Sequence, residues 1–212
     1  MLVLVSLPIL SGCPLLGKDE ESEGSDSTTN LATSDLAGDW DTPCIAKGTM
    51  AGPTGYAGYR DWLSVTGTDF FVMRAWYSTM TGAFCTGSMD VDATVEGTVA
   101  VGGLASGSST LSEIQFTITS AEVRGYTAGT RTILNNACAL ALASSTPASV
   151  LGNVCGGGGY TSNPSNNAQV DNVVSKSGTT LMMGAMETSM FIPGVLNGNP
   201  VPTSATVTFI KR

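Results

Sequence analysis

Apolar and polar positions alternate along much of the chain after residue 36, with a period of two residues. The clearest case is MDVDATVE (89–96), where Met, Val, Ala and Val take one set of positions and Asp, Asp, Thr and Glu the other. Successive side chains of a β-strand point to opposite faces, so this segment predicts a strand with one buried and one solvated face. EIQFTIT (113–119) repeats the pattern.

Other segments predict further strands. GYRDWLSVTGTDFFVMRAWYST (58–79) is rich in aromatic and β-branched residues and predicts a hairpin, with strands at 58–66 and 69–78 and a turn at Gly67. The remaining strand candidates are TVAVG (98–102), TTLMMGAM (179–186) and SATVTFI (204–210), which Asn-, Gly- and Pro-rich stretches separate.

One segment predicts a helix instead. In AGTRTILNNACALALAS (128–144), Leu134, Cys138, Ala141 and Leu142 share one helical face. Pro147 follows at a distance that would stop the helix.

Eight or nine short strands and one late helix predict an all-β domain. The short connections favour an up-and-down antiparallel barrel of about eight strands, and a β-sandwich is the alternative. Closing the sheet into a barrel would also remove the exposed edges that otherwise favour aggregation.

The first residues carry a different pattern. LVLVSLPIL (2–10) is apolar but too short to span a bilayer, and its length suits the core of a signal peptide. LSGC (10–13) resembles the lipobox of bacterial lipoproteins, which implies cleavage before Cys13 and lipidation of its thiol. The resemblance departs from the family pattern in one respect, because no Lys or Arg precedes the apolar run.

The segment after Cys13 has the composition of a disordered tether. KDEESEGSDSTTN contains no large apolar residue, so it cannot bury enough surface to offset its ordering entropy. We therefore expect a signal peptide at 1–12, a lipidated tether at 13–35 and a barrel domain at 36–212. Pro14 directly after the cysteine, by resemblance to enterobacterial lipoproteins, favours sorting to the outer membrane.

Charge and composition narrow the function. The net charge is −8, and six of the 17 acidic residues lie before Leu36, against Lys18 as the only base there. No basic patch is present to neutralise phosphates, which argues against a nucleic-acid partner. The chain contains no histidine, which excludes Ser–His–Asp and Cys–His catalysis and imidazole metal sites. We expect no cofactor, and an enzyme is the least favoured class.

The five cysteines are an odd number for an exported protein. Lipidation of Cys13 would leave four, which can pair in an oxidising compartment in three ways. Sequential pairing, Cys44–Cys85 and Cys138–Cys155, suits a meandering chain. A four-thiolate metal site is the alternative, although no C-x-x-C spacing supports it.

LAGDWDTPC (36–44) places Gly38 and Trp40 in a G-x-W motif at the start of the first expected strand. This motif resembles the one that opens the barrel of lipocalins. The resemblance implies that Trp40 closes the barrel floor and that a late arginine packs across its ring. Arg212 is the best-placed match, and Arg124 is the alternative.

Two groups of side chains are candidates for lining a ligand cavity. Phe71, Met73 and Tyr77 form one stripe of an apolar strand, and Met182, Met186 and Met190 share the parity of another segment. Flexible thioethers suit irregular apolar ligands. Core filling is the favoured alternative for the methionines, and an ordinary central strand is the alternative for the stripe of Phe71.

An acidic stripe accompanies these groups. Asp90, Asp92 and Glu96 lie at alternate positions of one strand, and we expect a solvated outer face rather than a metal site.

These features favour an exported protein, anchored to the bacterial outer membrane through an acyl chain on Cys13, that binds or carries a small apolar ligand. The alternative is a structural or interaction module of the outer membrane or cell surface with a filled core and no ligand.

Overall fold

A computed structural model of the 212-residue chain describes residues 30–46, 55–152, 166–184, 195–196 and 203–212. The helices are η1, a 3-10 turn (Thr33–Leu36), and α1 (Ala128–Cys138). The strands are β1 (Gly38–Asp41), β2 (Ile45–Ala46), β3 (Gly58–Thr66), β4 (Asp69–Thr81), β5 (Phe84–Leu104), β6 (Ser112–Gly125), β7 (Ala148–Ser149), β8 (Ala168–Ser177), β9 (Thr180–Met183), β10 (Val195–Leu196) and β11 (Val207–Lys211). The expected signal peptide, Cys13 and most of the expected tether lie outside the described residues.

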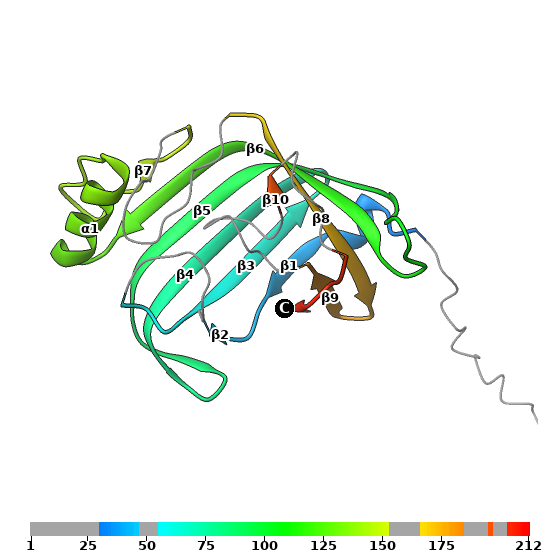
Figure 1. Cartoon of the computed structure of the whole chain (residues 1–212), viewed down its shortest axis with the longest axis horizontal. Coiled ribbons are helices and arrows are strands. Elements are labelled where there is room, and N and C mark those ends of the chain that lie inside the picture. The colour runs from blue at the N-terminus through cyan, green and yellow to red at the C-terminus, as the bar shows by residue number, and fades with distance from the viewer. Residues whose placement is uncertain (1–29, 47–54, 153–165, 185–194, 197–202) are drawn as a thin grey trace, which may run out of the picture.

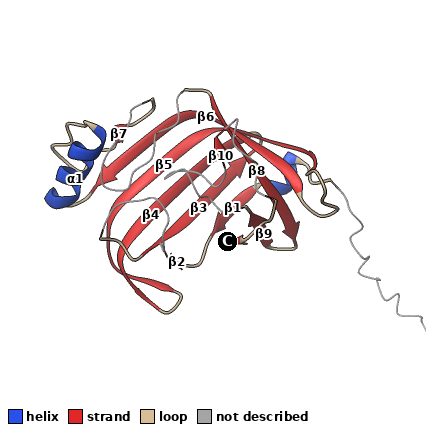
Figure 2. Cartoon of the chain, in the orientation of Figure 1, coloured by secondary structure: helices blue, strands red, loops and turns tan. Residues whose placement is uncertain are grey.

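Eight of these strands form a closed ring. Each of β1, β3, β4, β5, β6, β8, β9 and β11 pairs antiparallel with the next in this order, and β11 pairs back with β1. Figures 1 and 2 show the long strands β4, β5 and β6 curving around one side, with the short β9 and β11 completing the other. The predicted all-β, up-and-down arrangement of about eight strands is confirmed.

The predicted hairpin is also confirmed, since β3 and β4 pair across a turn at Gly67. The segments predicted as separate strands at 89–96 and 98–102 are instead parts of the single strand β5. Its register against β6 shifts between Glu96 and Gly97. At this bulge the backbones of β5 and β6 come so close that a Cβ on Gly97 would lie 1.9 Å from the Thr117 carbonyl oxygen. Glycine therefore lets one strand bend where the pattern suggested two.

The helix α1 is shorter than predicted. The Thr127 side chain caps its first turn by accepting a hydrogen bond from the Thr130 backbone N–H. It ends at Cys138 because Ala139 adopts a left-handed conformation, with φ of 51°. The Asn135 side chain then bonds both backbone groups of Leu142, so that residue turns back toward the helix instead of extending it.

Alternating side chains of the ring pack into one core. On β5, Val91, Ala93 and Val95 are buried, as the period-two pattern predicts. On β6 the same holds for the alternate residues from Ile114 to Ile118. The face that carries these buried side chains is called the inner face below, and the opposite one the outer face.

The segment before β1 packs against the ring. The Leu31 backbone N–H donates to Ser112 Oγ (3.2 Å), and the Val101 backbone N–H donates to Thr33 Oγ1 (3.1 Å). Leu36 is fully buried. Leu31 is partly buried against the same core, so the described segment from Leu31 to Leu36 packs on the ring. Figure 1 places this end of the ring opposite the end that carries α1.

A disulfide joins Cys44 to Cys85, as predicted. It ties the segment between β1 and β2 to the start of β5. Cys138 is also disulfide-bonded, but the predicted partner Cys155 lies outside the described residues.

The close approach at Gly97 makes a testable prediction. The change Gly97→Ala should lower the free energy of unfolding by about 1–3 kcal/mol, because the added methyl group forces two backbones apart. Gly103→Ala, on the same strand with open space around its Cα, is the matched control and should not destabilise the protein. Urea denaturation of both variants measures the difference, and equal stability would contradict the assigned packing.

Candidate functional site

A buried ion pair lies on the inner face of the ring. Asp61 of β3 and Arg74 of β4 are directly paired in register, and both side chains are 1% exposed. Arg74 Nε donates to Asp61 Oδ1 and Arg74 Nη2 to Asp61 Oδ2, both at 2.6 Å. This two-point geometry is the strongest pairing that a guanidinium and a carboxylate can form. It offsets part of the cost of removing both charges from water.

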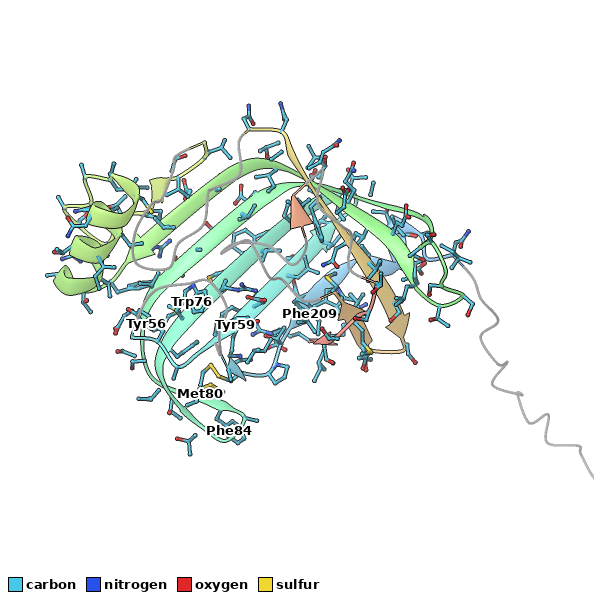
Figure 3. The ribbon with its side chains drawn as sticks, in the orientation of Figure 1. Tyr56, Tyr59, Trp76, Met80, Phe84 and Phe209 are labelled. Atoms are coloured by element: carbon cyan, nitrogen blue, oxygen red, sulfur yellow. A yellow bond between two sulfur atoms is a disulfide. The ribbon has the colours of Figure 1, made fainter. Side chains whose placement is uncertain are left out.

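Two aromatic rings cover the ion pair. Tyr59 and Trp76 occupy the next register position of the same two strands, with ring centroids 5.2 Å apart. The Arg74 guanidinium carbon lies 4.1 Å from the Tyr59 ring centroid and 5.7 Å from that of Trp76. Figure 3 shows both rings beside the long strands. The cation is therefore held by aromatic faces as well as by its carboxylate.

Burial raises the pKa of the Tyr59 hydroxyl to about 12; the positive charge of Arg74 opposes the rise and the negative charge of Asp61 adds to it. Tyr59 therefore stays neutral at physiological pH. The ion pair therefore lies beside an uncharged phenol, and the Asp61 backbone N–H donates to Thr42 Oγ1 (3.0 Å).

Two polar atoms of this site lack partners. Arg74 Nη1 and Trp76 Nε1 are buried N–H donors without a hydrogen-bond acceptor in the part of the chain that the structure describes. A buried donor that has no acceptor costs about 1–3 kcal/mol. Both side chains lie on the inner face of β4, so the two unpaired N–H groups lie on the same side of the sheet. We refer to Tyr59, Asp61, Arg74 and Trp76 as the inner polar site.

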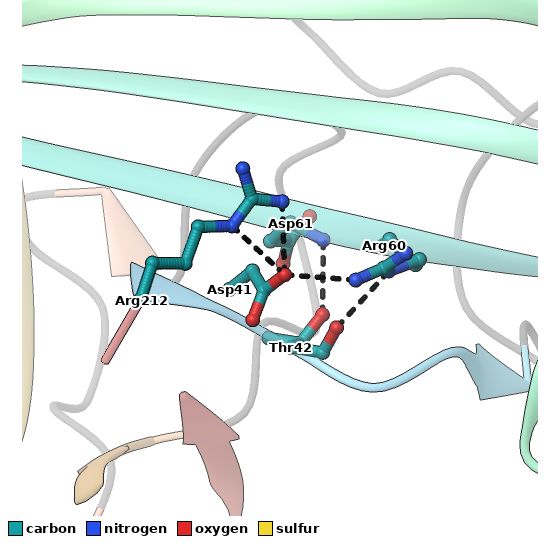
Figure 4. Close-up of polar contacts among 5 residues, drawn as sticks. All are labelled: Asp41, Thr42, Arg60, Asp61 and Arg212. Carbon is teal, nitrogen blue, oxygen red and sulfur yellow. Dashed lines mark hydrogen bonds and ion pairs between the residues drawn. The ribbon is translucent and has the colours of Figure 1, made fainter. Parts of the chain in front are cut away.

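A second charged cluster lies on the outer face, and its three charged side chains pair with one another. Asp41 Oδ2 accepts from Arg60 Nη2 (2.8 Å) and Arg212 Nη2 (2.9 Å), and Arg60 Nε donates to the Thr42 carbonyl oxygen (3.2 Å; Figure 4). The two guanidinium carbons lie 5.1 and 5.9 Å from the Trp62 ring centroid. This cluster fastens β11 to β1 and β3, which is a structural role.

The predicted acidic stripe is only partly solvated. Glu96 is exposed, but Asp92 is 3% exposed although it lies on the outer face. Its Oδ2 accepts a hydrogen bond from the Tyr126 hydroxyl at 2.6 Å, and Arg124 lies 3.9 Å from its Oδ1. Two long side chains from the end of β6 thus shield this carboxylate, which the strand pattern alone does not reveal.

The G-x-W motif lies where η1 meets the ring. Trp40 is fully buried, and its Nε1 donates to the Leu36 carbonyl oxygen at 2.7 Å. Gly38 has φ of +121°, which favours glycine, and a Cβ there would lie 2.9 Å from Lys211 Cε.

The cation over Trp40 is not the predicted one. Lys211 Nζ lies 5.3 Å from the Trp40 ring centroid, whereas Arg212 points to the outer face. The reason is register: Lys211 pairs directly with Trp40, so their side chains share a face and the next residue takes the other. Arg124, the alternative, lies on the outer face beside Asp92.

The predicted ligand-lining residues that the structure describes do not line the ring interior. Phe71, Met73 and Tyr77 lie on the outer face of β4, because the alternate residues Phe70 and Val72 are the buried ones. Met182 is 37% exposed, while its neighbour Met183 is fully buried. Met186 and Met190 lie outside the described residues.

The inner polar site was missed at the sequence level, although a signal was present. Arg74 has the same parity as Phe70, Val72 and Trp76, so the buried stripe of β4 contains one charge. Asp61 has the matching position on β3. A lone charge in an apolar stripe, opposite a counter-charge across a predicted hairpin, was sufficient to indicate a buried pair.

Three pockets lined by described residues lie away from this site. One of about 660 Å³ lies between the η1 segment and the β8–β9 turn, lined mainly by hydroxyl-bearing residues with Lys176. Two others, of about 380 and 400 Å³, lie along β3–β5 and along β5, β6 and β8. No side chain of the inner polar site contributes to these three.

Within the described ranges, no group of three His, Cys, Asp or Glu residues could hold a metal ion. Neither described helix is long and apolar enough to cross a membrane. No known protein-family model matches the chain, and no curated protein matches it significantly. The site geometry is therefore the basis for any functional conclusion.

The buried pair predicts strong coupling between its members. Either single change, Asp61→Leu or Arg74→Met, should lower the free energy of unfolding by about 3–5 kcal/mol, because it leaves an uncompensated buried charge. The double variant should be more stable than either single variant. Arg60→Met, which breaks a half-exposed pair on the outer face, is the control and should cost about 0–1 kcal/mol. Additive losses in a denaturation cycle would contradict the pairing.

Proposed function

We propose that the protein is an exported, lipid-anchored carrier that binds a small, mostly apolar ligand on the inner face of its ring. The observation that carries this proposal is the inner polar site, with two buried, unused N–H donors beside two aromatic rings. Ligand sites of this kind combine apolar walls with a few fixed polar groups that orient the ligand. An eight-stranded ring is also of a size that can hold one small molecule.

The cellular setting rests on separate support. The disulfide between Cys44 and Cys85 is typical of proteins in oxidising compartments. LSGC resembles a lipobox, and lipidation of Cys13 would place the ring close to a membrane. A carrier in that position would exchange apolar molecules with the bilayer or across the envelope, and we favour the outer membrane as its location.

A second candidate function is a structural or interaction module of the outer membrane or cell surface without a ligand. It is favoured by the tight burial of the ring's inner side chains. Trp40, Phe116 and Phe209 are all fully buried among the described residues, and the pockets described above lie elsewhere. The two functions differ in whether the purified protein takes up a small molecule.

Native mass spectrometry of protein purified without detergent separates these two functions. The carrier should retain a small molecule that is lost on denaturation, or take up one equivalent when mixed with fatty alcohols or sterols. A denatured sample of the same protein is the control for non-specific adducts. No retained molecule and no uptake would reject the carrier and leave the structural module.

The lipid anchor has its own test. Changing Cys13→Ser should release the protein from the membrane fraction into the soluble fraction, because the thiol that would carry the acyl chain is removed. Cys85→Ser, which breaks a disulfide of the ring and leaves Cys13 intact, is the control and should stay with the membrane. Membrane retention of the Cys13→Ser protein would refute the anchor.

A further inference from the structure

The charge balance of the inner polar site restricts the ligand that it could accept, given the proposed carrier function. The only charged side chains that are fully buried in the described part of the chain are Asp61, Arg74 and Asp92, and Asp92 lies on the outer face. Asp61 and Arg74 neutralise each other, so the inner face carries no net buried charge. A charged ligand group would therefore enter an apolar interior without a counter-charge.

The two polar atoms of the site that lack a partner among the described residues are both donors. Both carboxylate oxygens of Asp61 already accept from Arg74. The unused atoms are Arg74 Nη1 and Trp76 Nε1, and both can only donate. A ligand group bound there must consequently supply acceptors.

The positive charge of one donor, Arg74 Nη1, further favours ligands that carry an acceptor group. An acceptor that reaches Arg74 Nη1 receives a charge-assisted hydrogen bond, which is stronger than one from a neutral donor. The rings of Tyr59 and Trp76 stand beside it and offer flat apolar contact to the remainder of the ligand.

We propose that the inner polar site selects apolar molecules that carry a neutral oxygen acceptor, a hydroxyl, ether or carbonyl group, over the corresponding carboxylates and over plain hydrocarbons. The oxygen takes the place of the missing acceptor for Arg74 Nη1 and Trp76 Nε1. A carboxylate would satisfy the same donors but would leave one uncompensated negative charge beside Asp61. A hydrocarbon would leave both donors unpaired.

A matched series of probes tests this selection on the unmodified protein. Decane, 1-decanol, methyl decanoate and decanoate share one chain and differ only in the head group. Isothermal titration calorimetry at pH 8 should show 1-decanol and methyl decanoate binding about tenfold or more tightly than decane and decanoate, since a hydrogen bond to a charged donor is worth about one factor of ten.

One variant and one control locate the contact. Trp76→Phe removes the Nε1 donor while keeping an aromatic ring, and should weaken 1-decanol binding several-fold more than it weakens decane binding. Trp62→Phe makes the same change on the outer face and should leave both affinities unaltered. Circular dichroism establishes that each variant is folded.

The outcomes separate the inference from the carrier function. If decanoate binds as tightly as 1-decanol, or decane binds equally well, the head-group selection is wrong while the carrier function stands. The second result would mean that ordered water satisfies the two donors. If none of the four probes binds, both the selection and the carrier function are rejected.

Discussion

β1 and β11 meet over two residue pairs, Trp40 with Lys211 and Asp41 with Ile210. This short contact joins the first and last strands of the ring, and without it the eight strands would be an open sheet with two free edges. Side chains strengthen it on both faces. Lys211 covers the Trp40 ring on the inner face, and Arg212 pairs with Asp41 on the outer face. The Arg212 backbone N–H adds a hydrogen bond of 2.9 Å to the Asp39 carbonyl oxygen.

Closure changes the electrostatics of everything on the inner face. On an open, wet sheet, the pair of Asp61 and Arg74 would contribute little, because water screens both charges. Inside a closed ring, water is excluded, so the two charges hold each other tightly and an unpaired donor becomes costly. The character of the inner polar site thus depends on a contact between two strands that contribute none of its four side chains.

The sequence predicted the features that follow from local patterns. Period-two alternation gave the correct faces of β5 and β6, and Gly67 gave the correct turn, because these depend on neighbours in the chain. Cys44 and Cys85 were paired correctly from their order. The hydrophobic pattern gave no answer where contacts between distant parts of the chain decide which way a side chain faces. Both faces of β4 are apolar, so the pattern could not tell that Phe71 faces outward, and the backbone bulge at Gly97 is invisible to alternation.

The same distinction explains why the wrong cation was predicted at the chain's far end. A cation near Trp40 was expected, but Lys211 and Arg212 are adjacent and point to opposite faces, so only the pairing of β11 with β1 decides which one is used. A shift of one residue in the register of β11 against β1 would move each side chain from one face of the sheet to the other. Such decisions require the register between strands that are far apart in sequence.

The stability of the ring does not require the inner polar site. A buried ion pair can often be replaced by well-packed apolar residues of similar volume at no loss of stability. The neighbouring inner-face pair of β3 and β4 is apolar in this way, since Leu63 pairs with Val72 and both are buried. Only one step further along the same two strands, the chain instead holds a neutralised guanidinium with a spare donor and an indole N–H without an acceptor. Because packing gains nothing from these donors, we attribute their placement to the oxygen-bearing ligand proposed above and not to the requirements of the fold.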